Sequence, residues 1–355
     1  MICLPKFKIT MQPKLFLLAI LLTSIGCDKG DDSTLDYNHV IAENTNTHKI
    51  TIHPNKRVAS LKMSSDEYKS YVENDEFRKD NGRYRESIIK DIHKKFEDDY
   101  DYIILVLNQD EVPPELPSGV NAVIGNDLQG IGKTIFDYSS EYGSQGKLKS
   151  VVQMFSFDGI TRGPMLHEIM YNWGNYAIPT TTRSHWGYLG GSNKGQLGGF
   201  DQSTLVNNGG NSYTVNLFGE YANGGNSVPF SEFELYLMGM MPLSSVSPFD
   251  GFTEVSSLEY VDGHSKMRFN AEVKTRYTQS SIESLLGNRI PSYQDSQKDF
   301  RALVIAVSPS DLPEEEWTIL DNAALEFSKT ESDDSIGNNF WEATNGLGSI
   351  TIGDF

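Results

Sequence analysis

The segment MLHEIMYNWGNY, Met165 to Tyr176, contains most of the residues that could do chemistry. In the pattern H-E-x-x-H, two histidines four residues apart on one helix face hold zinc, and the glutamate acts as a general base. His167 and Glu168 fill the first two positions, but Tyr171 stands where the second histidine belongs. A phenol binds zinc weakly unless it ionises, and its ordinary pKa is about 10. We therefore expect His167 as a ligand, Glu168 as the catalytic base, and Tyr171 as a weak ligand or pocket wall.

Three further positions support this pattern. Gly174 lies seven residues after His167, where helices of this kind often turn sharply, and two ligand candidates follow downstream, His185 in SHWG and Glu234 in FELYLMG. Catalytic zinc ordinarily has three protein ligands and an open position for water. His167, His185 and Glu234 supply that number if the loops bring them together. Each also has a structural alternative: a helix histidine satisfied by a carbonyl, a loop histidine packed beside Trp186, and an acid at a helix N-terminus.

The strings GPMLHEIMYNWGNY, HWGYLGG and FSEFELYLMGMMP together resemble a group of bacterial zincin-like metallopeptidases. Members of that group have an H-E-x-x-H-x-W-G helix, a later H-W pair and an acidic residue before L-Y-L-M-G. The resemblance covers roughly residues 102–242 and implies a zincin-like fold with zinc as cofactor. It implies that His167 is a metal ligand, Glu168 the catalytic base and Glu234 the likeliest remaining ligand. His185 would be another ligand or a hydrogen-bond donor to the transition-state oxyanion.

A second arrangement stays open within the same resemblance. YLMGMM, residues 236–241, is similar to the methionine-containing turn beneath the metal in metzincins, which would shift ligation toward His185. The usual place of a third histidine in that arrangement is Ala177, so this version depends on His185. In either arrangement the strand predicted at SVVQMF, residues 150–155, would be the edge strand that pairs with an extended substrate.

The composition is that of an ordinary globular protein with an acidic balance. The chain has 355 residues, 38% hydrophobic and 22% charged, which is enough for one large domain or two modest ones. Its formal net charge is −18, and no run of Lys and Arg follows the N-terminus. A phosphate-binding surface needs a basic face, so the composition argues against a nucleic-acid partner. We expect a peptide or protein substrate.

The N-terminus predicts export and a lipid anchor. Basic residues precede the apolar run LFLLAILLTSIG and then Cys27. This run is too short for a comfortable transmembrane helix and predicts a lipoprotein signal peptide over residues 1–26, with Cys27 as the lipid acceptor. The alternative is a cleaved signal whose next residue happens to be cysteine. Apart from Cys3 inside that signal there is no other cysteine, so the body has no disulfide and no cysteine metal site.

The residues after the predicted signal are polar and acidic. Their composition predicts a flexible tether over residues 27–47. A lipid followed by a tether anchors a protein to a membrane and leaves its body in water. We therefore expect the chain at the bacterial cell envelope, lipid-anchored to the outer membrane or the cell surface.

Apolar periodicity predicts that an α+β body positions the candidate side chains. Residues 185–231 are rich in Gly, Asn and Ser and predict a Gly-rich hairpin insertion. We expect a zincin-like domain at 48–250 and a C-terminal α/β extension at 251–355 packed on it. The main expected strands are 102–108, 121–126, 148–156 and 300–308, and the main expected helices are 161–174, 231–242, 278–287 and 313–329.

Taken together, these patterns predict a lipid-anchored extracytoplasmic zinc peptidase with a weakened metal site. The position of Tyr171 leaves one alternative open. In that alternative the chain is a catalytically inactive zincin-fold surface lipoprotein, a pseudoenzyme that serves as a binding or assembly module.

Overall fold

A computed structural model of the chain describes residues 47–109, 116–180, 182, 184–332 and 337–355. The predicted signal peptide, the predicted lipid acceptor Cys27 and all but the last residue of the predicted tether lie outside them. In the described part of the chain, no helix has both the length and the apolar character that a membrane span requires.

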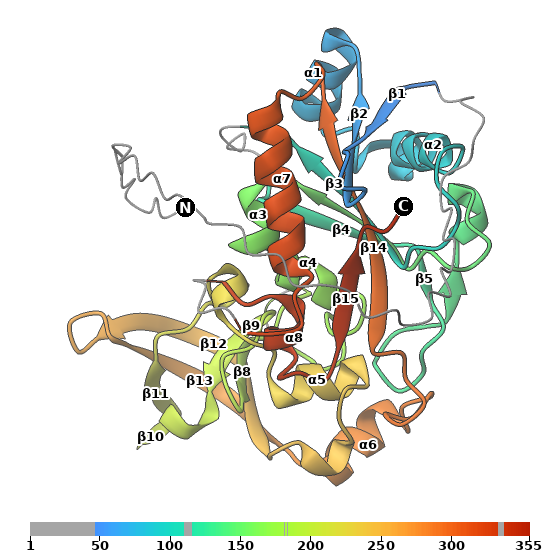
Figure 1. The fold of residues 1–355 in the computed structure, drawn as a ribbon. Coiled ribbons are helices and arrows are strands. Elements are labelled where there is room, and N and C mark those ends of the chain that lie inside the picture. The colour runs from blue at the N-terminus through green and yellow to red at the C-terminus, as the bar shows by residue number, and fades with distance from the viewer. Residues whose placement is uncertain (1–46, 110–115, 181, 183, 333–336) are drawn as a thin grey trace, which may run out of the picture. The chain divides into compact units, whose positions relative to one another are not determined.

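A seven-stranded mixed sheet forms the larger part of the body (Figure 1). Four strands in its middle run parallel, whereas the strands at its two ends run antiparallel to their neighbours. In spatial order the strands are β1 (Lys49–Ile52), β2 (Val58–Lys62), β14 (Asp299–Ser308), β3 (Tyr102–Leu107), β7 (Ser150–Met154) and β4 (Gly119–Val123), and β15 (Ser349–Ile352) also pairs with β14.

Helices cover both faces of this sheet, which explains why its inner strands are continuous apolar runs. All six residues of β3 are buried, as expected for a parallel strand with helices on both sides. Ile104 packs in a cluster with one set of helices, and its neighbour Ile103 packs with the other set. The first set is α3 (Asp158–Thr161), α4 (Met165–Met170) and α7 (Glu314–Phe327). The second set is α1 (Ser65–Glu73) and α2 (Arg83–Ile92).

A second sheet of six strands contains the Gly-rich region. β10 with β11 and β12 with β13 form antiparallel hairpins, whereas β8 runs parallel to β9, so the predicted hairpin insertion is part of a larger sheet. Aromatic side chains that include Phe200, Tyr213 and Phe269 form its own core. In order its strands are β10 (Val206–Gly209), β11 (Ser212–Asn216), β13 (Lys266–Tyr277), β12 (Phe249–Val261), β8 (Gly187–Gly191) and β9 (Gly198–Asp201).

The fold is mixed α+β, and most predicted elements occur near their predicted positions. Two further helices are α5 (Glu232–Met238) and α6 (Gln279–Leu286). The helix predicted at 161–174 differs: α3 ends at Thr161 and α4 begins only at Met165. Between them Gly163 has a φ of 106°, a backbone conformation that interrupts a helix and that glycine adopts without strain.

The predicted boundary at residue 250 does not divide the body. β14, from the predicted C-terminal extension, lies between β2 and β3 and is hydrogen-bonded to both. Residues 37–355 form one compact unit. The extension is therefore integral to the main sheet, because a parallel sheet joins segments that are distant in sequence.

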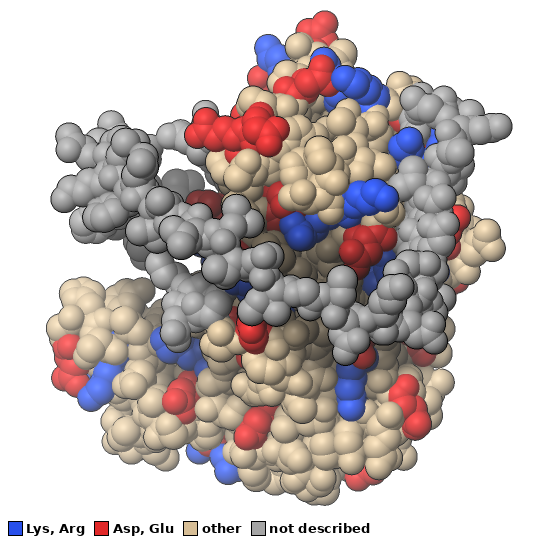
Figure 2. Space-filling view, in the orientation of Figure 1, with Lys and Arg blue, Asp and Glu red and all other residues tan. Residues whose placement is uncertain are grey.

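Charges of both signs are mixed on the surface. On the face shown in Figure 2, Lys and Arg side chains lie among Asp and Glu side chains. The net charge of −18 is therefore not gathered into one continuous acidic area on that face.

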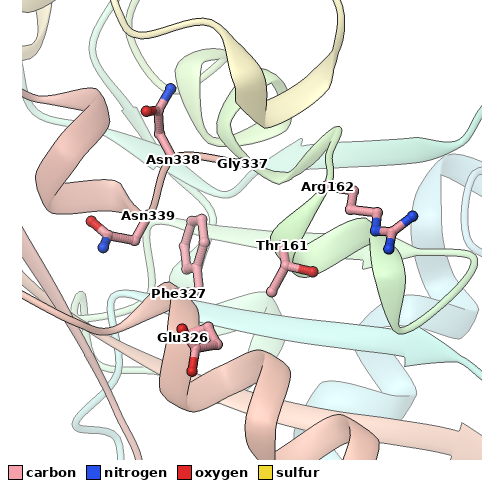
Figure 3. A pocket seen from close by; sticks show the side chains of 7 residues that line it. All are labelled: Thr161, Arg162, Glu326, Phe327, Gly337, Asn338 and Asn339. Carbon is pink, nitrogen blue, oxygen red and sulfur yellow. The ribbon is translucent and has the colours of Figure 1, made fainter. Parts of the chain in front are cut away.

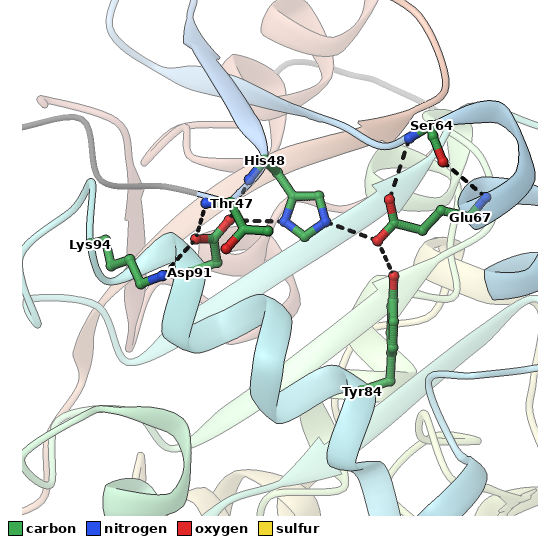
Figure 4. Close-up of polar contacts among 7 residues, drawn as sticks. All are labelled: Thr47, His48, Ser64, Glu67, Tyr84, Asp91 and Lys94. Carbon is green, nitrogen blue, oxygen red and sulfur yellow. Dashed lines mark hydrogen bonds and ion pairs between the residues drawn. The ribbon is translucent and has the colours of Figure 1, made fainter.

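His48 lies between two carboxylates at the start of the described body (Figure 4). Its Nδ1 is 2.8 Å from Asp91 Oδ2 on α2, and its Nε2 is 2.9 Å from Glu67 Oε1 on α1. Asp91 also accepts from the backbone amides of Thr47 and His48, and Glu67 accepts from the Tyr84 hydroxyl. The His48 side chain is only 12% exposed. This cluster ties the residues before β1 to both helices on that face of the sheet.

We expect this cluster to make the stability of the fold depend on pH. Burial disfavours the ionised form of all three groups, but hydrogen bonds outweigh it. These are the bonds of His48 to both carboxylates, of the Tyr84 hydroxyl to Glu67, and of the Thr47 and His48 amides to Asp91. The pKa of His48 is therefore raised, and the pKa values of Glu67 and Asp91 are lowered. The contribution of His48 is fully present below about pH 6.5 and is lost as pH rises through its folded-state pKa. The carboxylate contribution is present above about pH 4 and is lost as pH falls through the lowered pKa values.

Urea unfolding of wild type and His48→Gln at about pH 5.5 and about pH 8.5 tests this expectation. Wild type should lose about 1 kcal/mol more unfolding free energy than the variant between the two values. His264→Gln, at an exposed histidine in the turn after β12, is the matched control. An identical pH dependence in His48→Gln and wild type would contradict the role of the cluster.

Candidate functional site

Helix α4 holds two polar residues in a mostly apolar environment. Its four apolar residues are buried in the core, and His167 and Glu168 are only 6% and 5% exposed. The amide of Leu166 in the first turn donates to Asn226 Oδ1 at 3.1 Å. Asn226 Nδ2 donates to the carbonyl of Ile160 at 2.8 Å, so this one buried side chain joins α3 to the start of α4. The position of His167 and Glu168 therefore depends on a residue sixty positions away.

Three of the predicted side chains meet at one phenol oxygen. His167 Nε2 is 3.0 Å from Tyr171 Oη, and His185 Nε2 is 2.6 Å from the same oxygen. The two imidazole rings are nearly parallel, with centroids 5.5 Å apart. The Tyr171 ring stands almost perpendicular to both. The fold thus brings together the histidine of the helix, the tyrosine one turn later and the histidine of the following loop.

The hydrogen bonds assign the protons in this group. His167 Nδ1 is 2.7 Å from the carbonyl oxygen of Gln196, and because a carbonyl only accepts, Nδ1 carries the hydrogen. Burial lowers the pKa of His167 to about 4, so the ring is neutral at pH 7 and Nε2 presents a lone pair. Tyr171 therefore donates to His167 Nε2 and accepts from His185 Nε2. Burial raises the pKa of Tyr171, which keeps the hydroxyl protonated in this network.

The loop that carries His185 is fixed by its neighbours. Trp186 donates its indole N–H to the carbonyl of Gly174 at 2.9 Å, which links this loop to the end of the α4 segment. Thr180 Oγ1 donates to the His185 carbonyl at 2.7 Å. The ring of Tyr221 packs edge-on against the imidazole, with centroids 5.2 Å apart. His185 is therefore held beside Tyr171 by packing and by backbone contacts.

Glu234 does not join this group, and this corrects its prediction as a metal ligand. Its Oε1 accepts from the amides of Gln196 and Leu197 at 2.7 and 2.9 Å, and its Oε2 accepts from the Ser231 amide and hydroxyl at 2.7 and 3.1 Å. Among the described residues, no group of three or more His, Cys, Asp or Glu is placed to hold a metal ion. Glu234 acts on the site indirectly. It fixes the segment that contains Gln196, and the Gln196 carbonyl orients His167.

Glu168 faces the outermost strand of the main sheet. β4 ends the strand order, and a Cβ atom on its first residue, Gly119, would lie 2.9 Å from Glu168 Cγ and 3.0 Å from Oε1. Burial raises the pKa of Glu168 to about 8. The strand predicted as the edge, residues 150–155, is instead β7, an interior strand between β3 and β4. The edge beside the glutamate is therefore β4, which precedes β7 in the sequence.

The His167, Tyr171 and His185 atoms fit a zinc ion after a small expansion. Tetrahedral ligand atoms about 2.0–2.1 Å from zinc lie about 3.3 Å from one another. The two N···O separations at Tyr171 are 3.0 and 2.6 Å, so they must grow by about 0.3 and 0.7 Å. Tyr171 must also release its proton to bind as a phenolate. Two imidazoles and one phenol oxygen could then hold the ion.

A cavity of about 290 Å³ lies elsewhere, between α3 and α7 (Figure 3). None of the candidate residues of the site described above lines it. The residues around it are Thr161, Arg162, Glu326, Phe327, Gly337, Asn338 and Asn339.

Two residues that shape the site were not predicted from the sequence. Gln196 orients His167 through its backbone carbonyl, and a carbonyl leaves no signal in the residue type. Asn226 lies in a Gly- and Asn-rich stretch where asparagine ordinarily indicates a turn, yet its side chain is fully buried. The role of Glu234 did have a signal, because Ser231 followed three residues later by glutamate is the capping-box pattern of a helix N-terminus.

Comparison with known proteins finds no family, no curated protein and no solved structure that matches this chain. The zincin-like resemblance therefore remains an expectation based on the motifs of the sequence.

Proposed function

We propose that the chain is a zinc-dependent peptidase with a zincin-like fold and a weakened metal site, carried at the bacterial cell envelope by a lipid on Cys27. The observation that carries the proposal is the convergence of His167 Nε2 and His185 Nε2 on the Tyr171 hydroxyl. A buried set of nitrogen and oxygen donors suits zinc. The revised ligand set is His167, His185 and Tyr171, without Glu234. The apolar run before Cys27 supports the anchor.

The chemistry of the proposal divides among a few groups. Zinc would supply a Lewis acid that polarises the scissile carbonyl and makes a water molecule easier to deprotonate. Glu168 would take a proton from the attacking water in its ionised form, which becomes the majority form only above its raised pKa of about 8, and would deliver that proton to the leaving amine. The Gln196 carbonyl keeps His167 in the tautomer whose Nε2 is free to ligate.

An extended peptide is the substrate shape that suits this arrangement. β4 is the last strand of its sheet, and an outer strand offers backbone N–H and C=O groups to an added strand. Glu168 packs against Gly119 at the start of β4, so a peptide bound along this strand would pass the carboxylate. Tyr176 and Tyr221 are each 61% exposed, and Tyr221 packs against His185.

The proposal is tested with the purified full-length chain and an unfolded, casein-like substrate. Cleavage is expected to stop when a chelator removes the metal and to return when zinc is added back. Cleavage that resists chelation, or no cleavage at any zinc concentration, would overturn the proposed activity.

A second function is favoured by two differences from a zinc peptidase, at Tyr171 and at Glu234. The Tyr171 hydroxyl already satisfies both imidazoles without a metal, and the carboxylate of Glu234 is fully used by backbone amides and Ser231. Such a closed network suits an inactive zincin-fold lipoprotein that binds or assembles with another protein.

Tyr171→His separates the two functions. An imidazole is shorter than a phenol, so it vacates the space that the hydroxyl occupies between His167 and His185. Under the peptidase proposal zinc should bind at least about tenfold more tightly, measured by competition with a chelating indicator. Tyr176→His, at an exposed tyrosine, is the control. Unchanged zinc affinity in Tyr171→His would show that the pocket is not built for a metal and would favour the second function.

A further inference from the structure

Arg289 is a buried cation that the peptidase proposal does not use. The residue is 92% buried, and in the described part of the chain it forms no ion pair with a carboxylate. Burial lowers the pKa of Arg289 to about 10, because desolvation disfavours its charge. A buried charge without a counter-charge is costly in a protein interior.

The guanidinium is fixed by three acceptors, and only its Nη2 nitrogen remains without a partner among the described residues. Nε donates to the carbonyl of Leu237 at 3.0 Å, and Nη1 donates to the Pro291 carbonyl and the Ser296 hydroxyl. A guanidinium has five N–H donors, so two hydrogens on Nη2 have no partner among the described residues. Gly239 makes room for this group, since a Cβ there would lie 2.6 Å from Nη2. Nη2 is therefore held in a fixed position.

Arg289 lines a cavity of about 490 Å³ at the end of α5 and beside α6. It also lines a smaller cavity of about 40 Å³ that contains Asp127 and Ser296. Met241, Pro242 and Leu243 form an apolar wall, and the aromatic rings of Tyr236 and Tyr293 also line it. This combination of one fixed cation and an apolar wall is typical of small-molecule sites. None of the residues proposed for peptide cleavage lines the cavity.

We propose that this cavity binds a small organic monocarboxylate, with the carboxylate on Arg289 and an apolar body against Met241, Pro242 and Leu243. Arginine pairs well with carboxylates, and the two N–H groups of Nη2 can donate to one carboxylate, whose single negative charge the guanidinium balances. A doubly charged phosphate fits less well, because Glu283 lines the same cavity. Asp127 also acts electrostatically on Arg289, although it does not pair with it. The inference stands independently of the peptidase proposal.

The test uses N-acetyl-leucine and its uncharged amide as matched probes, with inorganic phosphate as a third. Calorimetry on the full chain should find the acid bound with a Kd on the order of 0.1–1 mM. The amide should bind at least about tenfold more weakly. Equal binding of acid and amide, or none, would overturn the proposal. Phosphate binding as tight as the acid would assign the cavity to phosphate and would also overturn it.

Replacing Arg289 would also remove its hydrogen bond to Leu237 near the end of α5 and could disturb the fold. The exposed residues Asn288 and Glu283, which line the same cavity, allow a test without that change. Asn288→Asp adds a negative charge and should weaken binding of the acid about 3–10-fold. Glu283→Gln removes a negative charge and should strengthen binding of the acid by a similar factor. Binding of the amide should not change in either variant. No effect of either charge on binding of the acid would place the ligand outside this cavity.

Discussion

Glu168→Gln is expected to lower the turnover of peptide cleavage by about 10²–10⁴-fold while zinc content stays the same. Glutamine has nearly the same shape but cannot take a proton from water. The residue is 95% buried and packs against Gly119 on β4, so the amide fills the same space. Initial rates on an unfolded protein substrate, measured together with bound zinc, test this expectation.

Glu315→Gln is the matched control, because it makes the same chemical change at an exposed position on α7. It should leave turnover within about twofold of wild type. If Glu168→Gln cleaves as fast as wild type, Glu168 is not the base. If it loses zinc together with activity, its carboxylate acts on the metal and not on the water.

Glu234→Ala is expected to reduce the free energy of unfolding by about 3–5 kcal/mol. The carboxylate accepts four hydrogen bonds from buried donors on Gln196, Leu197 and Ser231. Removing it leaves those donors without partners and opens a cavity, and both changes are costly. Urea unfolding monitored by circular dichroism measures the loss.

The neighbouring Glu232→Ala is the control for this prediction. The Glu232 carboxylate accepts one hydrogen bond, from the Ser247 amide, so its removal should cost about 1 kcal/mol or less. The comparison separates a structural role of Glu234 from a ligand role. If Glu234→Ala loses zinc but keeps its full unfolding free energy, Glu234 is a ligand after all.

Much of the local structure could be predicted from the sequence, because local patterns determine it. The apolar run of β3 indicated a strand, and Pro313 directly before α7 marked the start of that helix. The position of β14 between β2 and β3 could not be predicted. Strand order in a parallel sheet depends on contacts between distant segments, and residue types along one segment do not encode it.

In the candidate site, too, some residues could be predicted from local sequence patterns and others could not. The spacing of His167 and Tyr171 placed them on one helix face, and the H-W pair marked His185 as their companion. Glu234 was assigned as a ligand because it is acidic, although Ser231 and Glu234 together form the capping-box pattern of a helix N-terminus. Gln196 could not have been found, since its contribution is a backbone carbonyl.

The central claim is that His167 and His185 hold one zinc ion together with Tyr171. Its most direct test is the zinc content of the purified chain by elemental analysis, compared with His185→Ala and with His264→Ala as a surface control. We expect about one zinc per chain in wild type and in His264→Ala, and almost none in His185→Ala. Wild-type protein without zinc, or a His185→Ala variant that keeps it, would contradict the account.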